Sequence, residues 1–473
     1  MRRRLALVAA LALAVALALP GSALAHGLVG KQDLPIPRWL FAWAAAAVLV
    51  ISFVALAVLW PRPRLERARE RAVLKVPAAL EVLCGILGVA AFVITVYAGF
   101  AGSQTATANL APTVVYVVFW VAIPFATVLL GDVFAAFNPW RAVARGTAWL
   151  YGRARRGEAP AALPYPAWLG RWPAALGILA FAWVELVYVN KDDPSQLATM
   201  MLLYAAVQLI GMSVYGIEAW SRNADAFGLY FWLFSLLSPL HWRARTLYVR
   251  PPLAGAPRLD AVPGTVALLC TMIGTVSFDG LSQGQIWAGQ GGVAPELQQR
   301  FVNLGFSGEV ALEITFTIGL LIMVGLISGL YRLGVLGMHS IGRGHSTTEL
   351  SRRFVHSLIP IALAYVVAHY FSLLIYQGQA MAYLVSDPLG DGSDLFGTAT
   401  ATIDYNLVGA NGVWYVQVFA LVLGHAAGLT LAHDRALVLY SRARDATRSQ
   451  YWMLAVMVAF TSLGLWLLSA AAQ

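Results

Sequence analysis

A chain of 473 residues that is 59% apolar and only 12% charged, with a mean hydropathy of +0.70, lies outside the range of soluble globular proteins. Its two cysteines predict neither a disulfide framework nor a thiolate metal site. The net charge of +9 does not indicate a nucleic-acid partner, because membrane topology accounts for the positions of the basic residues, as described below.

The first 25 residues predict a cleaved secretory signal peptide. Three arginines precede a Leu/Ala run, which ends in the cleavage sequence Ala23-Leu24-Ala25. We expect the mature chain to begin at His26 on the outer side of the membrane; the alternative is an uncleaved anchor. The amine and ring nitrogen of an N-terminal histidine can chelate one copper ion, in an arrangement that resembles the histidine brace of periplasmic copper proteins. His26 is therefore a candidate metal ligand, unless it is incidental.

The rest of the chain contains ten apolar blocks, each long enough to cross about 30 Å of hydrocarbon as a helix. Because lipid offers no partner for exposed amides, we predict an all-α polytopic bundle after the signal peptide. We expect residues 26–473 to form a single transmembrane domain. Its predicted spans are 39–60, 78–101, 112–137, 172–190, 197–217, 262–282, 310–331, 354–376, 413–433 and 450–470.

The basic residues predict the orientation of these spans. Of the 32 Lys and Arg residues, 25 fall in five alternate loops, four in the segments on the opposite side, and three in the signal peptide. The positive-inside rule places the five basic loops in the cytoplasm. We predict a multi-pass protein of the plasma (inner) membrane, with the mature N-terminus and the C-terminus both outside. The basic loops are 61–77, 138–171, 218–261, 332–353 and 434–449.

Residues 226–240 are apolar but too short to cross comfortably, so we interpret them as a short cytoplasmic helix that is interfacial or re-entrant. Their surroundings, residues 223–244, resemble residues 131–142: both run from Asp and Phe through apolar residues to Asn-Pro or Ser-Pro and then Trp-Arg-Ala. Two copies of one unit would fit a repeat in a transporter-like fold. Shared chemistry at the membrane interface explains the likeness equally well.

Ionisable side chains inside hydrocarbon cost several kcal/mol unless they are paired or hydrated. Glu185, Asp279, Glu313 and His369 are expected about 5–10 Å from the outer ends of their spans, and His425 near the midplane. A cluster of these groups could bind Zn²⁺ or Cu²⁺, or relay protons. The alternative is that each forms a single interhelical hydrogen bond. The two histidines differ in depth by about 8 Å, which argues against one haem held by both.

Other polar residues have simpler explanations. Glu81 and Asp132 lie at the inner ends of spans and are expected to reach headgroup water, and the acidic outer loop 377–412 is large enough for a lid or gate. We interpret five further histidines as solvated or in contact with headgroups: His241, His339, His345, His356 and His433. The sequence contains none of the patterns H-x-H, H-E-x-x-H, G-x-S-x-G, G-x-x-x-x-G-K-[ST] or C-x-x-C.

Several segments together resemble a known family: 25–43, 131–142, 277–283, 354–379 and 424–437. The resemblance is to integral membrane proteins of an actinobacterial type that carry the label fenitrothion hydrolase, and it covers essentially the whole mature chain. The label implies hydrolysis of an organophosphate triester. His26, Asp279, His369 and His425 lie within the family-like segments.

Three functions remain open from the sequence. The first is transport or handling of a small solute or metal ion through a His/carboxylate site in the outer half of the bundle. The second is a membrane-embedded, metal-dependent hydrolase or oxidase, in which bound copper or zinc would activate water. The third is a structural or assembly subunit. The expected partners are the lipid bilayer and a small-molecule or metal-ion ligand.

Overall fold

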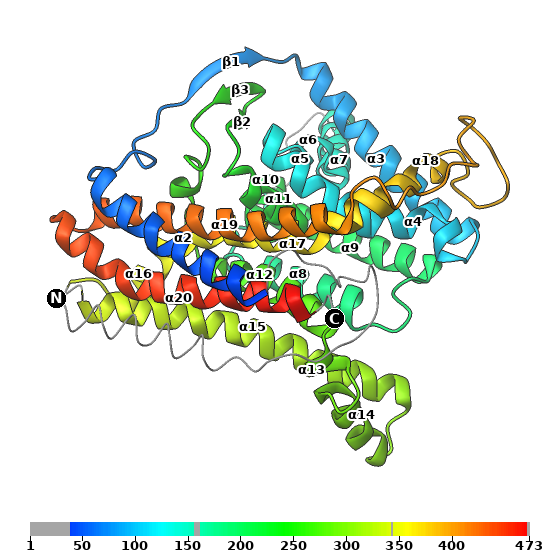
Figure 1. Ribbon diagram of the computed structural model, residues 1–473. Helices are drawn as coiled ribbons and strands as arrows, with labels where there is room; N and C mark the ends of the chain where they lie inside the picture. Colours follow the sequence, from blue (N-terminus) through cyan, green and yellow to red (C-terminus); the bar gives the residue numbers. More distant parts are fainter. Residues whose placement is uncertain (1–37, 156–160, 342–343, 471–473) are drawn as a thin grey trace. The chain divides into compact units, whose positions relative to one another are not determined.

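The computed structural model describes residues 38–155, 161–341 and 344–470. Most of these residues are helical, which confirms the predicted mainly helical fold (Figure 1). The predicted signal peptide and His26 lie outside the described residues.

Seven described helical segments are long and apolar enough to cross a membrane, so the chain is a membrane protein. They are Ala78–Ala101 (α3), Leu110–Leu130 (α4, η2 and α5), Pro194–Tyr215 (α9), Thr265–Ser282 (α12), Gly308–Ser340 (in α15, which ends at Ile341), Thr347–Leu384 (α16 to α18) and Ala410–Leu439 (α19). The other three predicted spans are also helical, at Arg38–Leu59 (α2), Trp172–Leu186 (α8) and Ala443–Ala470 (α20). The total of ten spans remains a prediction.

Shorter elements connect these helices. They are β1 (Arg71–Lys75), η1 (Ala106–Ala108), α6 (Phe134–Phe137), α7 (Pro139–Arg155), α10 (Ile217–Asn223), α11 (Ala226–Ser235), β2 (Leu240–Arg243), β3 (Thr246–Val249), η3 (Ala256–Arg258), α13 (Gln285–Ala288) and α14 (Val293–Asn303). Within the segment Leu110–Leu130, η2 (Val114–Ala122) is a π-helix. Within Thr347–Leu384, the elements are α16 (Thr347–Phe354), η4 (Val355–Leu358), α17 (Ile359–Gln377), η5 (Gly378–Ala380) and α18 (Met381–Leu384).

One predicted span is too long. The prediction continued to residue 137, but α5 ends at Leu130, because Gly131 adopts a φ of 84° that a helix cannot accommodate. Asp132 therefore lies beyond the helix, where its carboxylate accepts a hydrogen bond from the N–H of Ala135, near the start of α6.

The chain folds into two compact units, each discontinuous in sequence. Of the described residues, unit 1 comprises 38–67, 270–341, 344–369 and 410–470, and unit 2 comprises 68–155, 161–269 and 370–409. In unit 1, α2, α19 and α20 lie side by side (Figure 1). A buried cluster of four side chains joins them: Leu49, Phe53, Leu429 and Leu454.

Two glycines bring α19 into backbone contact with a neighbouring segment of unit 1. A Cβ on Gly424 would lie 2.3 Å from the Cβ of Ala364, and one on Gly428 would lie 2.8 Å from the carbonyl oxygen of Ser357. The spacing is that of a G-x-x-x-G motif, in which small residues let two membrane helices pack closely. His425 lies between these glycines and is fully buried.

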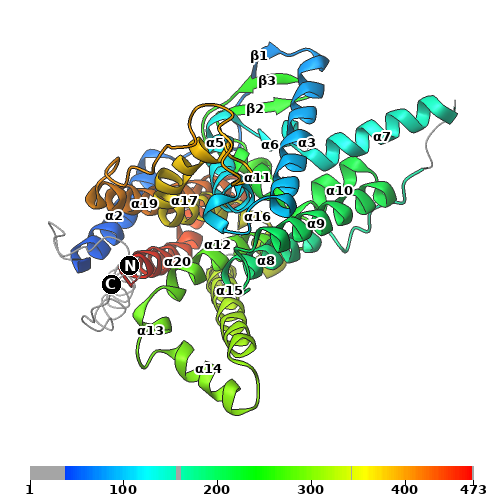
Figure 2. The ribbon, with the colours of Figure 1, turned by 90° about the vertical axis from the view of Figure 1, so that its right-hand side faces the viewer.

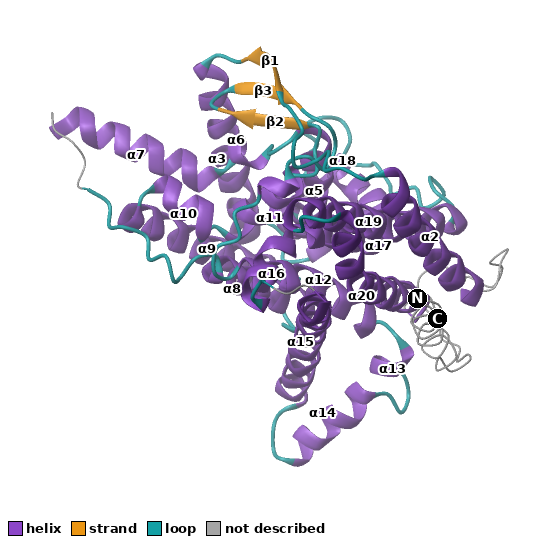
Figure 3. Ribbon diagram, turned by 90° about the vertical axis from the view of Figure 1, so that its left-hand side faces the viewer, coloured by secondary structure: helices purple, strands orange, loops and turns teal. Residues whose placement is uncertain are grey.

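Unit 2 contains a small antiparallel sheet, of order β1-β3-β2, that the sequence did not predict (Figure 3). The strands have four or five residues each. Arg250, directly after β3, donates hydrogen bonds to the carbonyl oxygens of Ser235 and Ser238 and pairs with Glu70 beside β1. The guanidinium therefore both caps the C-terminus of α11 and ties the sheet to it.

Helix α11 is the short apolar segment expected to be interfacial or re-entrant. Eight of its ten residues are buried, so the protein covers it on nearly every side. Its aromatic rings contribute to the core of unit 2, where Tyr230 stacks on Trp120 at 4.6 Å and Phe231 meets Phe119 edge-on at 5.2 Å. This burial contradicts a helix that lies on the membrane surface, whereas a re-entrant helix enclosed by protein is compatible with it.

Candidate functional site

An aspartate and a histidine in the membrane helices of unit 1 form a close pair. Nε2 of His369, on α17, lies 2.7 Å from Oδ2 of Asp279, on α12. The two side chains are only 21% and 13% exposed, respectively. An N···O distance of this size is characteristic of a hydrogen bond strengthened by charge. Of the six candidate residues, these two are the ones that the described structure shows in contact.

Packing on both helices fixes the pair. Directly before Asp279, Phe278 packs edge-on against Trp287 of α13 and Phe316 of α15. Figure 2 shows α13 and α14 beside the start of α15. One turn before His369, the Tyr365 hydroxyl donates a hydrogen bond to the carbonyl oxygen of Phe460, which anchors α17 on α20. The carboxylate and the imidazole are therefore held by rigid elements rather than by loops.

Glu185 belongs to unit 2 and has aromatic neighbours. The hydroxyl of Tyr370 donates a hydrogen bond of 3.3 Å to its carboxylate, and the hydroxyls of Tyr116 and Tyr230 lie within electrostatic range. The Lys191 ammonium caps the end of α8 through the backbone carbonyl of Glu185. Neutral phenols surround this carboxylate, whereas a titratable imidazole contacts Asp279.

The remaining candidates lie on other helices or outside the description. Glu313 is half-buried on α15, where its carbonyl oxygen accepts a hydrogen bond from Thr317. His425 is buried on α19, with Nδ1 2.7 Å from the carbonyl oxygen of Leu421. In the part of the chain that the structure describes, no three His, Cys, Asp or Glu side chains gather into a group that could hold a metal ion.

Sequence reasoning missed a buried carboxylate in unit 1, Asp434 on α19. It accepts four hydrogen bonds: from the indole N–H of Trp60 at 2.8 Å and from the backbone N–H groups of Arg64, Leu65 and Glu66 at 2.7 to 3.1 Å. These donors lie about 370 residues earlier in the chain, so no local sequence pattern could have revealed them.

The residues on either side of Asp434 bind the same segment. Nε2 of His433 lies 3.2 Å from the carbonyl oxygen of Trp60, and Arg435 forms an ion pair with Glu66. His433 is 1% exposed and His356 is 2% exposed. The prediction that these two histidines contact water or headgroups is therefore wrong, because tertiary packing covers them.

Unit 2 contains a second buried carboxylate with four donors. Asp225 accepts hydrogen bonds from the side chains of Asn138, Trp140 and Tyr204 at 2.8 to 3.0 Å, and from the N–H of Gly228. Like Asp434, it is 0% exposed. Fixed hydrogen-bond donors satisfy both carboxylates, which gives them an architectural role.

The acidic loop 377–412 directs its carboxylates at its own backbone. Asp387 accepts hydrogen bonds from the N–H groups of Asp391 and Gly392, and Asp394 accepts one from Ala399. These contacts shape turns within the loop.

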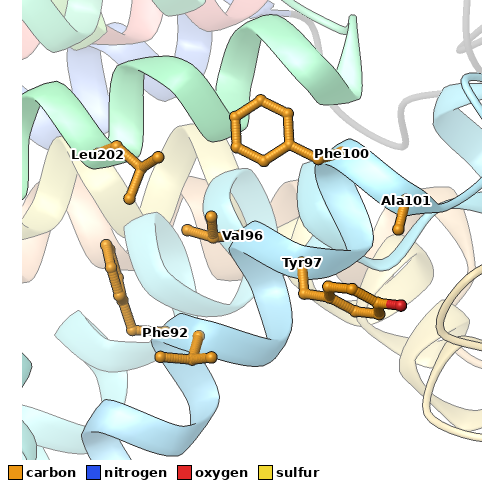
Figure 4. Close-up of a pocket in the computed structure, with 7 residues that line it drawn as sticks. Phe92, Val96, Tyr97, Phe100, Ala101 and Leu202 are labelled. Carbon is orange, nitrogen blue, oxygen red and sulfur yellow. The ribbon is translucent and has the colours of Figure 1, made fainter.

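An open apolar groove of about 480 Å³ lies elsewhere in unit 2, between α3 and α9, and its lining includes Phe92 and Leu202 (Figure 4). Its lining contains no carboxylate or imidazole.

Comparisons of the chain with models of protein families, with curated proteins and with solved structures found no match.

Proposed function

We propose that this protein is a proton-coupled transporter of a small charged solute, and that the Asp279–His369 pair binds the coupling proton. The observation that carries the proposal is the 2.7 Å contact between a carboxylate and an imidazole on two membrane helices. Imidazole is the side chain whose ordinary pKa lies closest to physiological pH, so it exchanges protons under the conditions of the cell.

The charge of the pair changes with each proton. With one proton shared between them, the two groups carry no net charge; loss of that proton leaves −1, and gain of a second leaves +1. A net charge in a low-dielectric site is costly, so a solute of the opposite charge stabilises it. Proton binding at Asp279 and His369 therefore becomes linked to binding of a cation or an anion.

A metal ion is a possible solute. The pair supplies two ligands, whereas resident zinc sites use three or four from the protein. A metal ion that passes through would complete its coordination with water or with further groups, and it would be cargo rather than a cofactor. Copper and zinc are the metals that an imidazole–carboxylate pair suits.

The two similar segments of unit 2 support a repeat of the kind found in transporters. Each segment, 131–142 and 223–244, begins with an aspartate, Asp132 or Asp225, that accepts a hydrogen bond from the backbone N–H three residues later. The same sequence signature therefore places a hydrogen-bonded carboxylate near the start of a short helix in both places.

These two segments also pack on each other reciprocally. The end of the first contacts the start of the second, where Asn138 and Trp140 donate hydrogen bonds to Asp225. The end of the second returns to the start of the first, where Trp242 donates a hydrogen bond of 3.1 Å to the carbonyl oxygen of Leu130. Reciprocal contacts of this kind fit the pseudo-two-fold axis that relates inverted repeats.

The test is a flux assay on the purified protein in liposomes that contain a pH-sensitive dye. Proton flux is measured under an imposed membrane potential with a panel of solutes: small carboxylates, phosphate, organic amines, Cu²⁺ and Zn²⁺. We expect at least one solute to accelerate proton flux. Asp279→Asn and His369→Gln should abolish the acceleration, and Glu309→Gln, on an exposed surface of α15, should retain it.

Two results would overturn the proposal. In the first, no solute changes proton flux although the protein is folded. In the second, fenitrothion is hydrolysed by the same preparation and the hydrolysis depends on Asp279, which would assign the pair to an enzyme of the kind that the family label implies.

A further inference from the structure

The small sheet of unit 2 lies at the shared end of two membrane helices. Strand β1 ends at Lys75, and α3 begins three residues later at Ala78. From β2, the indole N–H of Trp242 donates to the carbonyl oxygen of Leu130, the last residue of another span. Figure 2 shows the three strands beside the start of α3. The sheet therefore lies where the bilayer meets water, on the side that the sequence predicts to be cytoplasmic.

The register of the strands gives this sheet an apolar face. Leu247 of β3 is opposite Leu74 of β1 and Trp242 of β2, and residues directly opposite each other point to the same side. Val249, two residues after Leu247, shares that side. Leu74 is 54% exposed, Val249 41% and Trp242 36%, so the protein leaves much of this face uncovered. Lipid is the cover that such a surface finds at this depth.

Basic side chains occupy the opposite face and the turn of the hairpin. Lys75 and Arg243 are both opposite Thr246, so the two cations share the other side of the sheet. Arg245 lies in the turn between β2 and β3, and all three cations are exposed. The guanidinium of Arg243 lies 4.7 Å from the ring centre of Tyr248, which positions its charge without neutralising it.

The protein supplies no anion for these three cations. In the described part of the chain, none of them forms an ion pair with a carboxylate. Glu70, which directly precedes β1, is already paired with Arg250 and Arg258. Charge complementarity therefore points to an anion from outside the chain.

The turn carries its arginine in a strained backbone conformation. Ala244 and Arg245 connect β2 to β3 with φ of 46° and 65°, in the left-handed region. Two-residue hairpin turns of this kind normally contain Asn and Gly, because a larger side chain is unfavourable at positive φ. Within the described chain, the exposed guanidinium of Arg245 makes no hydrogen bond or ion pair that would offset the strain. The side chain is therefore free to bind a partner.

Another β-strand is a poor partner for this sheet. The free edge belongs to β1, where the register with β3 shifts at a bulge between Ala72 and Leu74. The charged side chains of Arg71 and Lys75 flank the bulge. Bulges and charges on an edge strand disfavour pairing with a further strand. A bilayer surface, in contrast, offers hydrocarbon to the apolar face and phosphate groups to the cations.

We propose that this sheet binds anionic phospholipids of the adjacent leaflet: its apolar face contacts the acyl chains, and its cations bind the headgroup phosphates. Arginine suits this task because its planar guanidinium forms two parallel hydrogen bonds to a phosphate. Clusters of basic residues beside a membrane span attract anionic lipid by the same electrostatics. The inference goes beyond the proposed transport function and does not depend on it.

Photo-crosslinking identifies what covers the apolar face. Benzoylphenylalanine replaces Leu74, and the protein is irradiated in liposomes that contain phosphatidylglycerol and phosphatidylcholine in equal amounts. Mass spectrometry of the intact protein then identifies the adduct. We expect adducts with phosphatidylglycerol to exceed those with phosphatidylcholine at least about tenfold, because each cation close to an anionic surface contributes about fivefold.

Three results of this experiment would overturn the proposal. A crosslinked dimer would make the sheet an interface between two copies of the chain. Equal adducts with both lipids would leave only an apolar contact with the bilayer. Folded protein without any lipid adduct would show that the sheet lies away from the membrane.

A double variant tests the cations themselves. Arg243→Gln combined with Arg245→Gln should lower the preference for phosphatidylglycerol at least about fivefold. The matched control is Arg153→Gln combined with Arg222→Gln, which removes the same charge from exposed positions on α7 and α10 of the same unit. This control should keep the preference of the wild type. Equal losses in the two double variants would reveal general electrostatic attraction rather than a site.

Arg245→Gly separates lipid binding from folding. Glycine relieves the positive φ and removes the guanidinium, so we expect a thermal midpoint at or above that of the wild type. The preference for phosphatidylglycerol should nevertheless fall about fivefold. A folded Arg245→Gly protein that keeps the full preference would contradict the role of the turn.

Discussion

Two buried aspartates of unit 1, Asp434 and Asp279, have opposite surroundings. Asp434 accepts four hydrogen bonds from N–H groups, and none of these donors changes its charge between pH 5 and 8. Asp279 contacts an imidazole, a group whose ordinary pKa lies in that range. Burial alone therefore does not distinguish the two carboxylates, whereas the nature of the hydrogen-bond donor does.

The largest expected effect is that of Asp434→Ala. This substitution leaves the indole N–H of Trp60 and three backbone N–H groups without their acceptor, so we expect a loss of about 3 kcal/mol or more in the free energy of unfolding. Denaturant unfolding in detergent micelles measures it. The control is Asp192→Ala at an exposed position, which should change stability by less than about 0.5 kcal/mol. Equal losses in both variants would show that Asp434 is not a structural anchor.

A second prediction concerns the helix that carries Asp434. In Gly424→Ala, the added methyl group would overlap Ala364, where a Cβ would approach to 2.3 Å, and we expect a loss of about 1–3 kcal/mol. Gly325→Ala on α15 is the matched control, because a Cβ there meets nothing within 4 Å. Thermal unfolding of the two variants should separate them clearly; similar midpoints would contradict the close packing of α19.

The third prediction uses Asp132, the counterpart of Asp225 in the first of the two similar segments. Burial raises the pKa of Asp132 from 3.8 to about 6, and nearby Asp225 adds to the rise. Because the folded state holds the proton more tightly, the contribution of Asp132 to stability is present below pH 4 and is lost as the pH rises through about 6. Unfolding of wild type and Asp132→Asn between pH 4 and 8 measures it. We expect the wild type to lose roughly 1–2 kcal/mol more than the variant over this range.

The smallest effect on stability is expected from Asp279→Asn. The amide keeps a hydrogen-bonding contact with His369, so we expect a cost of about 1 kcal/mol or less, although proton-coupled flux is lost. Denaturant unfolding and the flux assay on one preparation give both values. A stability loss as large as that of Asp434→Ala would place Asp279 among the structural carboxylates.

The sequence predicted the helices well because their signals are local. Helix α3 has the predicted bounds, 78–101, since Pro77 precedes it and Gly102 follows it. An apolar run between two such residues needs no tertiary information. The strand Arg71–Lys75, in contrast, is short and charged, and it forms only because β3 pairs with it from about 175 residues further along the chain.

The candidate site could be predicted only in part, because only part of it depends on local sequence signals. Counting residues placed Asp279 and His369 at similar depths, because helical rise is regular. Which helices are neighbours is a tertiary property, so the contact itself could not be derived.

The contact between Trp60 and Asp434 has a consequence for how the protein is made. The two residues are separated by 374 positions. At about 5–20 residues per second, the ribosome needs roughly 20–75 s to synthesise the chain between them. During that interval the N–H groups after α2 lack their final acceptor. Unit 1 is therefore completed only near the end of synthesis, and early termination before Asp434 should yield a product that the cell degrades.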